Sequence, residues 1–120
     1  MFLQLNHQKL SVFIMAKKMA LECYKITKSF PADERFNMIQ QIRRAALSVV
    51  LNIAEGASRT SDAERKRFCE ISRGSLIEID AAFDIANELG YFSGISHEVL
   101  GDAVNQTFGM LTGLLKSKQA

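Results

Sequence analysis

Apolar residues recur every three or four positions in four successive stretches of this chain, and this spacing constrains the fold more than any other feature. Such a repeat places apolar side chains on one face of an α-helix. The stretches cover about residues 10 to 28, 33 to 55, 62 to 89 and 97 to 117. No segment alternates strongly enough to predict a β-strand. The pattern therefore predicts an all-α protein.

The first two helices are separated by the sequence SFPAD. Pro31 disfavours helical geometry at the residue before it, so it ends the first helix. Asp33 and Glu34 suit the positively polarised start of a second helix. Gly56 is the glycine expected at the end of that helix.

The last two helices carry their own end signals. Ser61 and Glu64 form an S-x-x-E capping box at the start of the third helix. Gly90 is its expected C-terminal glycine, and Ser96 is positioned to cap the fourth helix. Short connections make successive helices antiparallel neighbours, which predicts an up-and-down four-helix bundle.

Composition supports one domain over residues 1 to 120. The chain has 120 residues, of which 48% are hydrophobic and 23% charged, with a single proline. Its net charge is only +2, which by itself argues weakly for nucleic-acid binding. The charge is unevenly spread, however, because residues 1 to 60 carry a net +5 and the rest a net −3.

The cysteines and the apolar runs bear on the cellular compartment. Cys23 and Cys69 lack CxxC spacing, which favours free thiols in a reducing compartment. No apolar run approaches the roughly 20 residues of a membrane span. We expect a soluble cytoplasmic protein without a membrane partner.

The third helix is apolar over a wider face than one small bundle requires. Ile77, Ala81 and Ile85 lie beside its main apolar seam. Two explanations remain open at this stage. The extra apolar surface either mediates self-association or completes a thick core.

A polar stripe runs along the second helix beside its apolar seam. Its members are three or four residues apart, and polar residues around Gly74 on the third helix are expected to face them. We interpret the two sets as a structural contact that fixes helix register, with a solvated face and a ligand site as alternatives. The residues are Gln41, Arg44, Ser48, Asn52, Glu55, Arg73, Ser75 and Glu78.

The sequence offers no constellation for catalysis or for a metal. A di-iron bundle needs Glu-x-x-His pairs, yet Gln4 and Gly94 stand three residues before His7 and His97. Phosphate-binding loops and nucleophile elbows are also missing from the sequence. We therefore predict no catalytic residue, no cofactor and no enzymatic activity.

Basic residues are the main candidates for a binding surface. Guanidinium groups bind phosphate through two hydrogen bonds, so arginines can contact RNA or DNA. The alternative is a solvated face with local ion pairs. The primary candidates are Arg43, Arg44, Arg59, Arg65, Lys66 and Arg67, and the secondary candidates are Lys17, Lys18 and Lys25.

Several motifs in order resemble a known family. The stretches TKSFP, QIRRAALS, NIAEGASR, GSLIEI and ELGYF are similar to those of the four-helix bundle proteins encoded by intervening sequences in bacterial 23S ribosomal RNA genes. The resemblance covers about residues 10 to 115. Where that family usually reads Ser-Ile-Pro-x-Asn, this chain has no proline between Ser48 and Asn52.

This resemblance implies a left-handed bundle that assembles as a homopentameric ring in a bacterium. A more distant relative is the accessory protein of a reverse transcriptase in diversity-generating retroelements, a basic pentamer that binds nucleic acid. By analogy, RNA or DNA is an expected partner. The competing expectation is a protein-interaction scaffold whose acidic second half offers Asp80, Asp84 and Glu88 to a protein partner.

Overall fold

The computed structural model describes residues 1–117 and consists of four long helices. They are α1 (Ser11–Thr27), α2 (Met38–Ala57), α3 (Asp62–Glu88) and α4 (Glu98–Lys116). Two short 3-10 helices, η1 (Asn6–Lys9) and η2 (Ala32–Glu34), precede α1 and α2. No strand occurs within residues 1–117, so the predicted all-α class is confirmed there. Residues 118–120 of the expected domain lie outside the described part.

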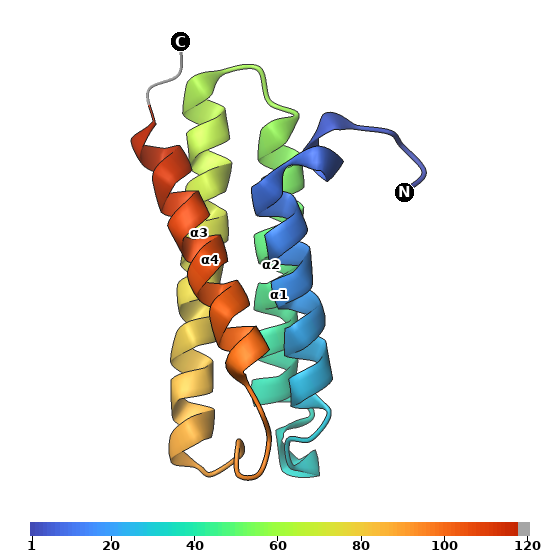
Figure 1. The fold of residues 1–120 in the computed structure, drawn as a ribbon, viewed down its shortest axis with the longest axis vertical. Helices are drawn as coiled ribbons and strands as arrows, with labels where there is room; N and C mark the ends of the chain where they lie inside the picture. Colours follow the sequence, from blue (N-terminus) through green and yellow to red (C-terminus); the bar gives the residue numbers. More distant parts are fainter. Residues whose placement is uncertain (118–120) are drawn as a thin grey trace.

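The helices lie side by side, and each runs opposite to the one before it (Figure 1). In sequence order, α1 contacts α2, α2 contacts α3, α3 contacts α4, and α4 returns to α1. The beginnings of α1 and α3 therefore share one end of the molecule with the ends of α2 and α4. This end carries the α2–α3 connection, and the opposite end carries the other two connections.

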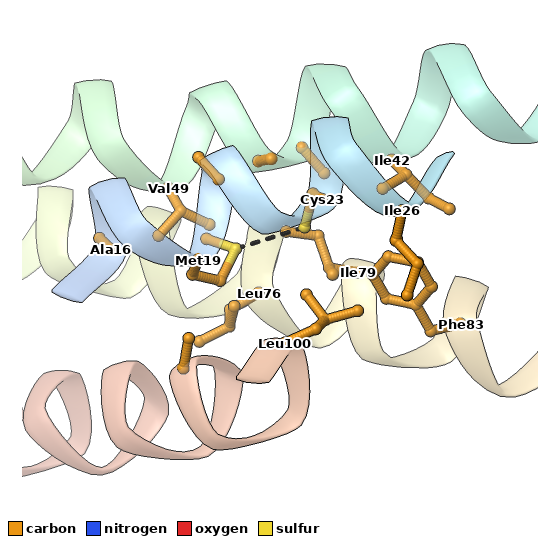
Figure 2. Packing of buried hydrophobic residues seen from close by; sticks show 14 of the residues in the cluster. Ala16, Met19, Cys23, Ile26, Ile42, Val49, Leu76, Ile79, Phe83 and Leu100 are labelled. Atoms are coloured by element: carbon orange, nitrogen blue, oxygen red, sulfur yellow. Dashed lines mark hydrogen bonds between the residues drawn. The ribbon is translucent and has the colours of Figure 1, made fainter. Parts of the chain in front are cut away.

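The core is built from the apolar seams that the spacing predicts. Met19, Leu76, Ile79 and Leu111 are completely buried. Figure 2 shows Met19 and Cys23 of α1 among residues of the other helices, with the Cys23 thiol 3.5 Å from the Met19 sulfur. Burial raises the pKa of this thiol to about 12, so Cys23 is a neutral apolar side chain at physiological pH.

The start of α2 differs from the sequence expectation. The helix begins at Met38, five residues later than about residue 33, because Ala32–Glu34 form the separate helix η2. Tyr91, beyond the end of α3, donates a hydrogen bond from its hydroxyl to Glu34 Oε2 at 2.7 Å. Asp33 and Glu34 thus do not begin α2, and Glu34 instead ties η2 to the α3–α4 connection.

Two of the predicted helix-end signals are observed and two are not. Gly56 does not end α2, because the helix continues through Ala57 and Gly56 is not among the glycines with a positive φ. The Glu64 backbone N–H donates to Ser61 Oγ at 3.1 Å, so Ser61 caps α3. Gly90 has φ +81°, a left-handed conformation that suits glycine after a helix. Ser96 does not cap α4, because His97 occupies the cap position and no side chain makes the capping bond.

Aromatic rings close the end of the bundle that holds the α1–α2 and α3–α4 connections. Phe30, between α1 and η2, packs edge-on against Phe83 and Phe92, with ring centroids 6.2 and 6.0 Å apart. Phe83 and Phe92 also contact each other at 5.6 Å. These contacts bury apolar rings where a helix pair would otherwise end in water.

Part of the predicted apolar surface stays outside the core. Ile71 of α3 and Leu89, directly after it, are exposed, and so are Ile77, Ala81 and Ile85. These residues therefore do not complete a thick core within one chain. Among the described helices, none is long and apolar enough to cross a membrane.

Candidate nucleic-acid interface

The polar stripe of α2 meets α3 through its serines. Ser48 Oγ and Ser75 Oγ are 2.8 Å apart, although these residues are 27 positions apart in the sequence. The Asn52 amide nitrogen donates to the Ser48 carbonyl oxygen at 2.8 Å and to Ser48 Oγ at 3.1 Å. The expected contact between the stripe and α3 is therefore present at Ser48 and Ser75.

Other members of the polar set do not join this contact. The side chains of Gln41, Arg44 and Glu78 are exposed and make no hydrogen bond or ion pair within residues 1–117. Glu55 forms an ion pair at 2.7 Å with Arg59, which lies just after the end of α2. The outer part of the stripe is thus a solvated face, as the alternative interpretation held.

Arg73 faces α4 rather than α2. Its Nε donates to Thr112 Oγ1 at 2.9 Å, and its guanidinium lies 4.4 Å from the centre of the Phe108 ring. Gly74 is not closely approached by a neighbouring helix, because an added Cβ there would meet nothing within 4 Å. Ser75 and Arg73 are two residues apart, so on a helix they point to different neighbours.

A buried serine provides a second α2–α3 link that the sequence analysis missed. Ser72 is completely buried, and its hydroxyl donates to the Val49 carbonyl oxygen at 2.8 Å. The sequence does indicate its burial, because Ser72 stands four residues before the core residue Leu76 and so lies on the same helix face. Packing is also tight near the end of α2, where a Cβ on Gly56 would lie 2.9 Å from Phe68 Cβ.

Arg43 and Arg44 are adjacent in sequence but have different surroundings. Arg43 is half-buried, and it donates from Nε to Thr27 Oγ1 at 3.0 Å and from Nη2 to the Tyr24 carbonyl oxygen at 3.1 Å. Its guanidinium also lies 4.9 Å from the centre of the Tyr24 ring. Arg43 therefore fastens α1 to α2, whereas Arg44 is exposed to solvent.

The α2–α3 connection gathers the remaining candidate arginines, but most have local partners. Arg59 is within 2.7 Å of Glu55 and 3.7 Å of Glu64. Arg65 donates from Nη1 to the carbonyl oxygens of Arg59 and Thr60, at 2.8 and 3.0 Å. The two glutamates thus neutralise the charge of Arg59, and Arg65 stabilises the backbone of the connection.

Lys66 and Arg67 complete this basic cluster. Lys66 Nζ lies 3.6 Å from Asp62 Oδ2. Arg67 is exposed, and its guanidinium is 5.8 Å from the centre of the Phe68 ring. Of the residues around the connection, Arg67 is thus the freest to contact an external phosphate.

The lysines of α1 form a basic surface with fewer local contacts than the residues around the α2–α3 connection. Lys17, Lys18 and Lys25 are exposed and make no ion pair with any residue of the described chain. Lys28, which follows the helix and which the sequence analysis did not single out, is exposed and unpaired in the same way. Leu21, which is 62% exposed, lies among them on the outer side of α1. We call Lys17, Lys18, Leu21, Lys25 and Lys28 the α1 outer face.

An acidic surface lies between α3 and α4. Two hollows of about 270 and 240 Å³ adjoin there, and Asp80 lines both of them. Asp84 lines the larger hollow, together with the rings of Phe83 and Phe92. Neither aspartate makes an ion pair within residues 1–117. In the same range, no group of three His, Cys, Asp or Glu side chains could hold a metal ion.

Comparison with protein families decides what kind of bundle this is. The family model for the 23S rRNA-intervening sequence protein matches residues 8–113, which span all of α1, α2 and α3 and most of α4. The chain belongs to this family. A comparison with curated proteins finds no match.

Membership of the 23S rRNA-intervening sequence protein family confirms the resemblance drawn from the motifs. Two of the motifs fall in the parts of the fold that join α2 to α3. NIAEGASR covers the end of α2 and its connection, and GSLIEI lies in the middle of α3 opposite Ser48. In this family member these motifs therefore carry helix–helix contacts, including those of Ser75 and Gly56.

Proposed function

We propose that this protein is a non-enzymatic, homopentameric ring of left-handed bundles that binds RNA or DNA through phosphate contacts in the bacterial cytoplasm. The observation that carries the binding proposal is the α1 outer face, whose lysines are exposed and have no ion-pair partner in the described part of the chain. Unpaired surface cations can exchange their counterions for phosphates, which is the main source of nonspecific nucleic-acid affinity. Arg44 and Arg67 are further contacts, because both are exposed.

Arg43 is left out of the proposed interface. Its guanidinium already donates to α1 and lies against the Tyr24 ring. Binding a phosphate would require breaking these contacts. Arg59, Arg65 and Lys66 take a secondary place for the same reason, since each has a partner at the α2–α3 connection.

The proposal of self-assembly rests on apolar residues that the single chain leaves exposed at helical spacing. Leu47 and Leu51 are four residues apart on α2, and Ile85 of α3 is four residues before Leu89, which directly follows that helix. Ile85 and Leu89 are each 55% exposed. Paired apolar residues on two helices are expected to be covered by another copy. A ring of five would also multiply the small net charge of each chain to about +10.

The first experiment is light scattering of the purified protein across a salt series, with bound nucleic acid followed by the ratio of absorbances at 260 and 280 nm. A pentamer that carries nucleic acid at low salt and loses it at high salt supports both parts of the proposal. A clean monomer contradicts the assembly. A pentamer that never carries nucleic acid contradicts the binding.

The location of the interface is tested with two matched double variants. Lys18→Gln/Lys25→Gln removes two charges from the α1 outer face, and Lys66→Gln/Arg67→Gln removes two charges from the α2–α3 connection. Fluorescence anisotropy with labelled RNA should show a salt dependence shallower by about 2 in log–log slope for the first variant. A smaller change is expected for the second. The reverse order of effects would place the interface at the connection.

A protein-interaction scaffold is the second candidate, and the acidic hollows between α3 and α4 favour it. Asp80 and Asp84 stand unpaired beside aromatic rings, a setting that suits a basic side chain of a protein partner. Under this alternative, a lysine-rich peptide binds the protein and Asp80→Asn/Asp84→Asn abolishes that binding, while no nucleic acid is carried even at low salt. If nucleic acid binds and the peptide does not, the first proposal stands alone.

A further inference from the structure

A cavity of about 150 Å³ lies at the end of the bundle that carries the α2–α3 connection. Its apolar lining includes Val12 of α1, Ile53 of α2 and Leu111 of α4. Leu10 and Leu114 also line it and are 42% and 44% exposed, so the cavity is reached from the surface. An apolar cavity of roughly this volume holds one benzene-sized molecule.

Asn52 brings an unused acceptor to this cavity. Its amide nitrogen donates to the Ser48 carbonyl oxygen and to Ser48 Oγ. Because a backbone carbonyl can only accept, these bonds fix which end of the amide is nitrogen. The Asn52 side-chain oxygen receives no hydrogen bond within residues 1–117, although Asn52 is half-buried and lines the cavity.

Asp62 brings a second unused acceptor. Its Oδ1 is inaccessible to water and has no hydrogen-bond partner, while Oδ2 lies 3.6 Å from Lys66 Nζ. Asp62 also lines the cavity. The torsion about the Cβ–Cγ bond of an aspartate is broad, so the carboxylate can rotate to present an oxygen to a donor in the cavity. A buried acceptor without a donor is costly and calls for a partner.

The two cationic side chains that line the cavity already have partners in the protein. Lys66 is next to Asp62, and Arg65 donates to two carbonyl oxygens of the connection. The polar groups left to be satisfied at the cavity are therefore acceptors. A suitable ligand supplies the donor.

We propose that this cavity binds a small, mainly apolar molecule that carries one hydroxyl or amino group. The apolar part lies against Val12, Ile53 and Leu111, and the donor reaches the Asn52 oxygen and the Asp62 carboxylate. The size limits the ligand to about one six-membered ring. This inference does not depend on nucleic-acid binding, because none of its contacts involves the α1 outer face.

The test compares toluene, benzyl alcohol and benzylamine, which share one carbon skeleton and differ in the donor. Binding to the full chain is followed by amide chemical shifts at millimolar concentration. We expect saturable shifts at Asn52, Asp62 and Cys69, with at least one donor-bearing probe binding roughly tenfold more tightly than toluene. Equal affinity for all three probes, or no saturable shift at these residues, would overturn the proposal.

Two substitutions, each with a control, locate the binding and identify the acceptor of the ligand's hydrogen bond. Ala57→Leu adds bulk to a cavity-lining position and should remove binding, whereas Ala63→Leu changes an exposed alanine outside the lining and should not. Asp62→Asn removes the carboxylate charge and should weaken benzylamine more than benzyl alcohol. Asp102→Asn, on the exposed side of α4, is its control. Binding that survives Ala57→Leu unchanged would place the probes elsewhere and contradict the inference.

Discussion

Ser48 of α2 and Ser75 of α3 are joined hydroxyl to hydroxyl at 2.8 Å in the middle of the bundle. Both side chains are half-buried, and Asn52 donates to the same Ser48 hydroxyl. The three residues form a short polar chain at the edge of an apolar contact. A hydrogen bond between polar groups favours one register of the two helices, because sliding either helix by a residue separates the hydroxyls.

Removing one of these hydroxyls should destabilise the fold moderately. Ser75→Ala is expected to lower the free energy of unfolding by about 1 kcal/mol, since one intramolecular hydrogen bond is lost. Ser48→Ala/Ser75→Ala should cost less than the sum of the two single variants. Urea unfolding at a fixed protein concentration measures this, with Ser93→Ala in an exposed loop as the control. Strictly additive effects would show that the two hydroxyls do not interact.

The two adjacent arginines should differ in how strongly their substitution lowers stability. Arg43→Met removes two hydrogen bonds to α1 and the contact with the Tyr24 ring, so we expect a loss of about 2 kcal/mol in unfolding free energy. Arg44→Met should change stability by less than about 0.5 kcal/mol, because Arg44 is exposed. Thermal unfolding of both variants checks this. Equal effects would mean that Arg43 is not a fastening residue.

Two glycines on neighbouring helices should differ in the sign of their response to alanine. A Cβ on Gly56 would lie 2.9 Å from Phe68 Cβ, so Gly56→Ala should force α2 and α3 apart and destabilise by about 1–3 kcal/mol. Gly74→Ala meets no atom within 4 Å and should stabilise α3 by up to about 1 kcal/mol. Denaturation midpoints of the two variants give the comparison. A stabilising Gly56→Ala would contradict the tight contact.

The Glu34–Tyr91 bond should make stability depend on pH in the acidic range. The Tyr91 hydroxyl lowers the pKa of Glu34 below its ordinary value of 4.5. Since the folded state favours the carboxylate, this stabilisation is present above pH 4.5 and is lost as the pH falls through the lowered pKa. Tyr91→Phe should therefore raise the pKa of Glu34 and destabilise the protein more at pH 7 than at pH 3.

Carboxyl chemical shifts followed through a pH titration measure this pKa directly. Tyr24→Phe is the matched control, because it keeps the ring under Arg43 and removes a hydroxyl with no hydrogen bond in the described chain. An unchanged pKa of Glu34 in Tyr91→Phe would show that the bond does not form in solution.

The sequence predicted the α-helices well where the apolar pattern was long and the cap was local. Ser61 and Gly90 act through their own backbone neighbours, so a short stretch of sequence contains all that is needed to identify them. The start of α2 was predicted too early, because the role of Glu34 depends on Tyr91, 57 residues away. The space around Gly74 is likewise a property of the packed structure, since only the neighbouring helix decides whether a glycine is closely approached.

The sequence by itself determined the all-α class, the four helices, most of the core positions and, through its motifs, the family. These follow from periodicity and local capping, which depend on residues within a few positions of each other. Only the tertiary structure decided that the Arg43 side chain bonds to α1 while that of Arg44 is exposed. It also decided that the described lysines of α1 lack the ion pairs and hydrogen bonds that Arg59 and Arg65 make. Whether a charged side chain can contact an external phosphate depends on the groups packed beside it. The local spacing of residues does not specify those neighbours.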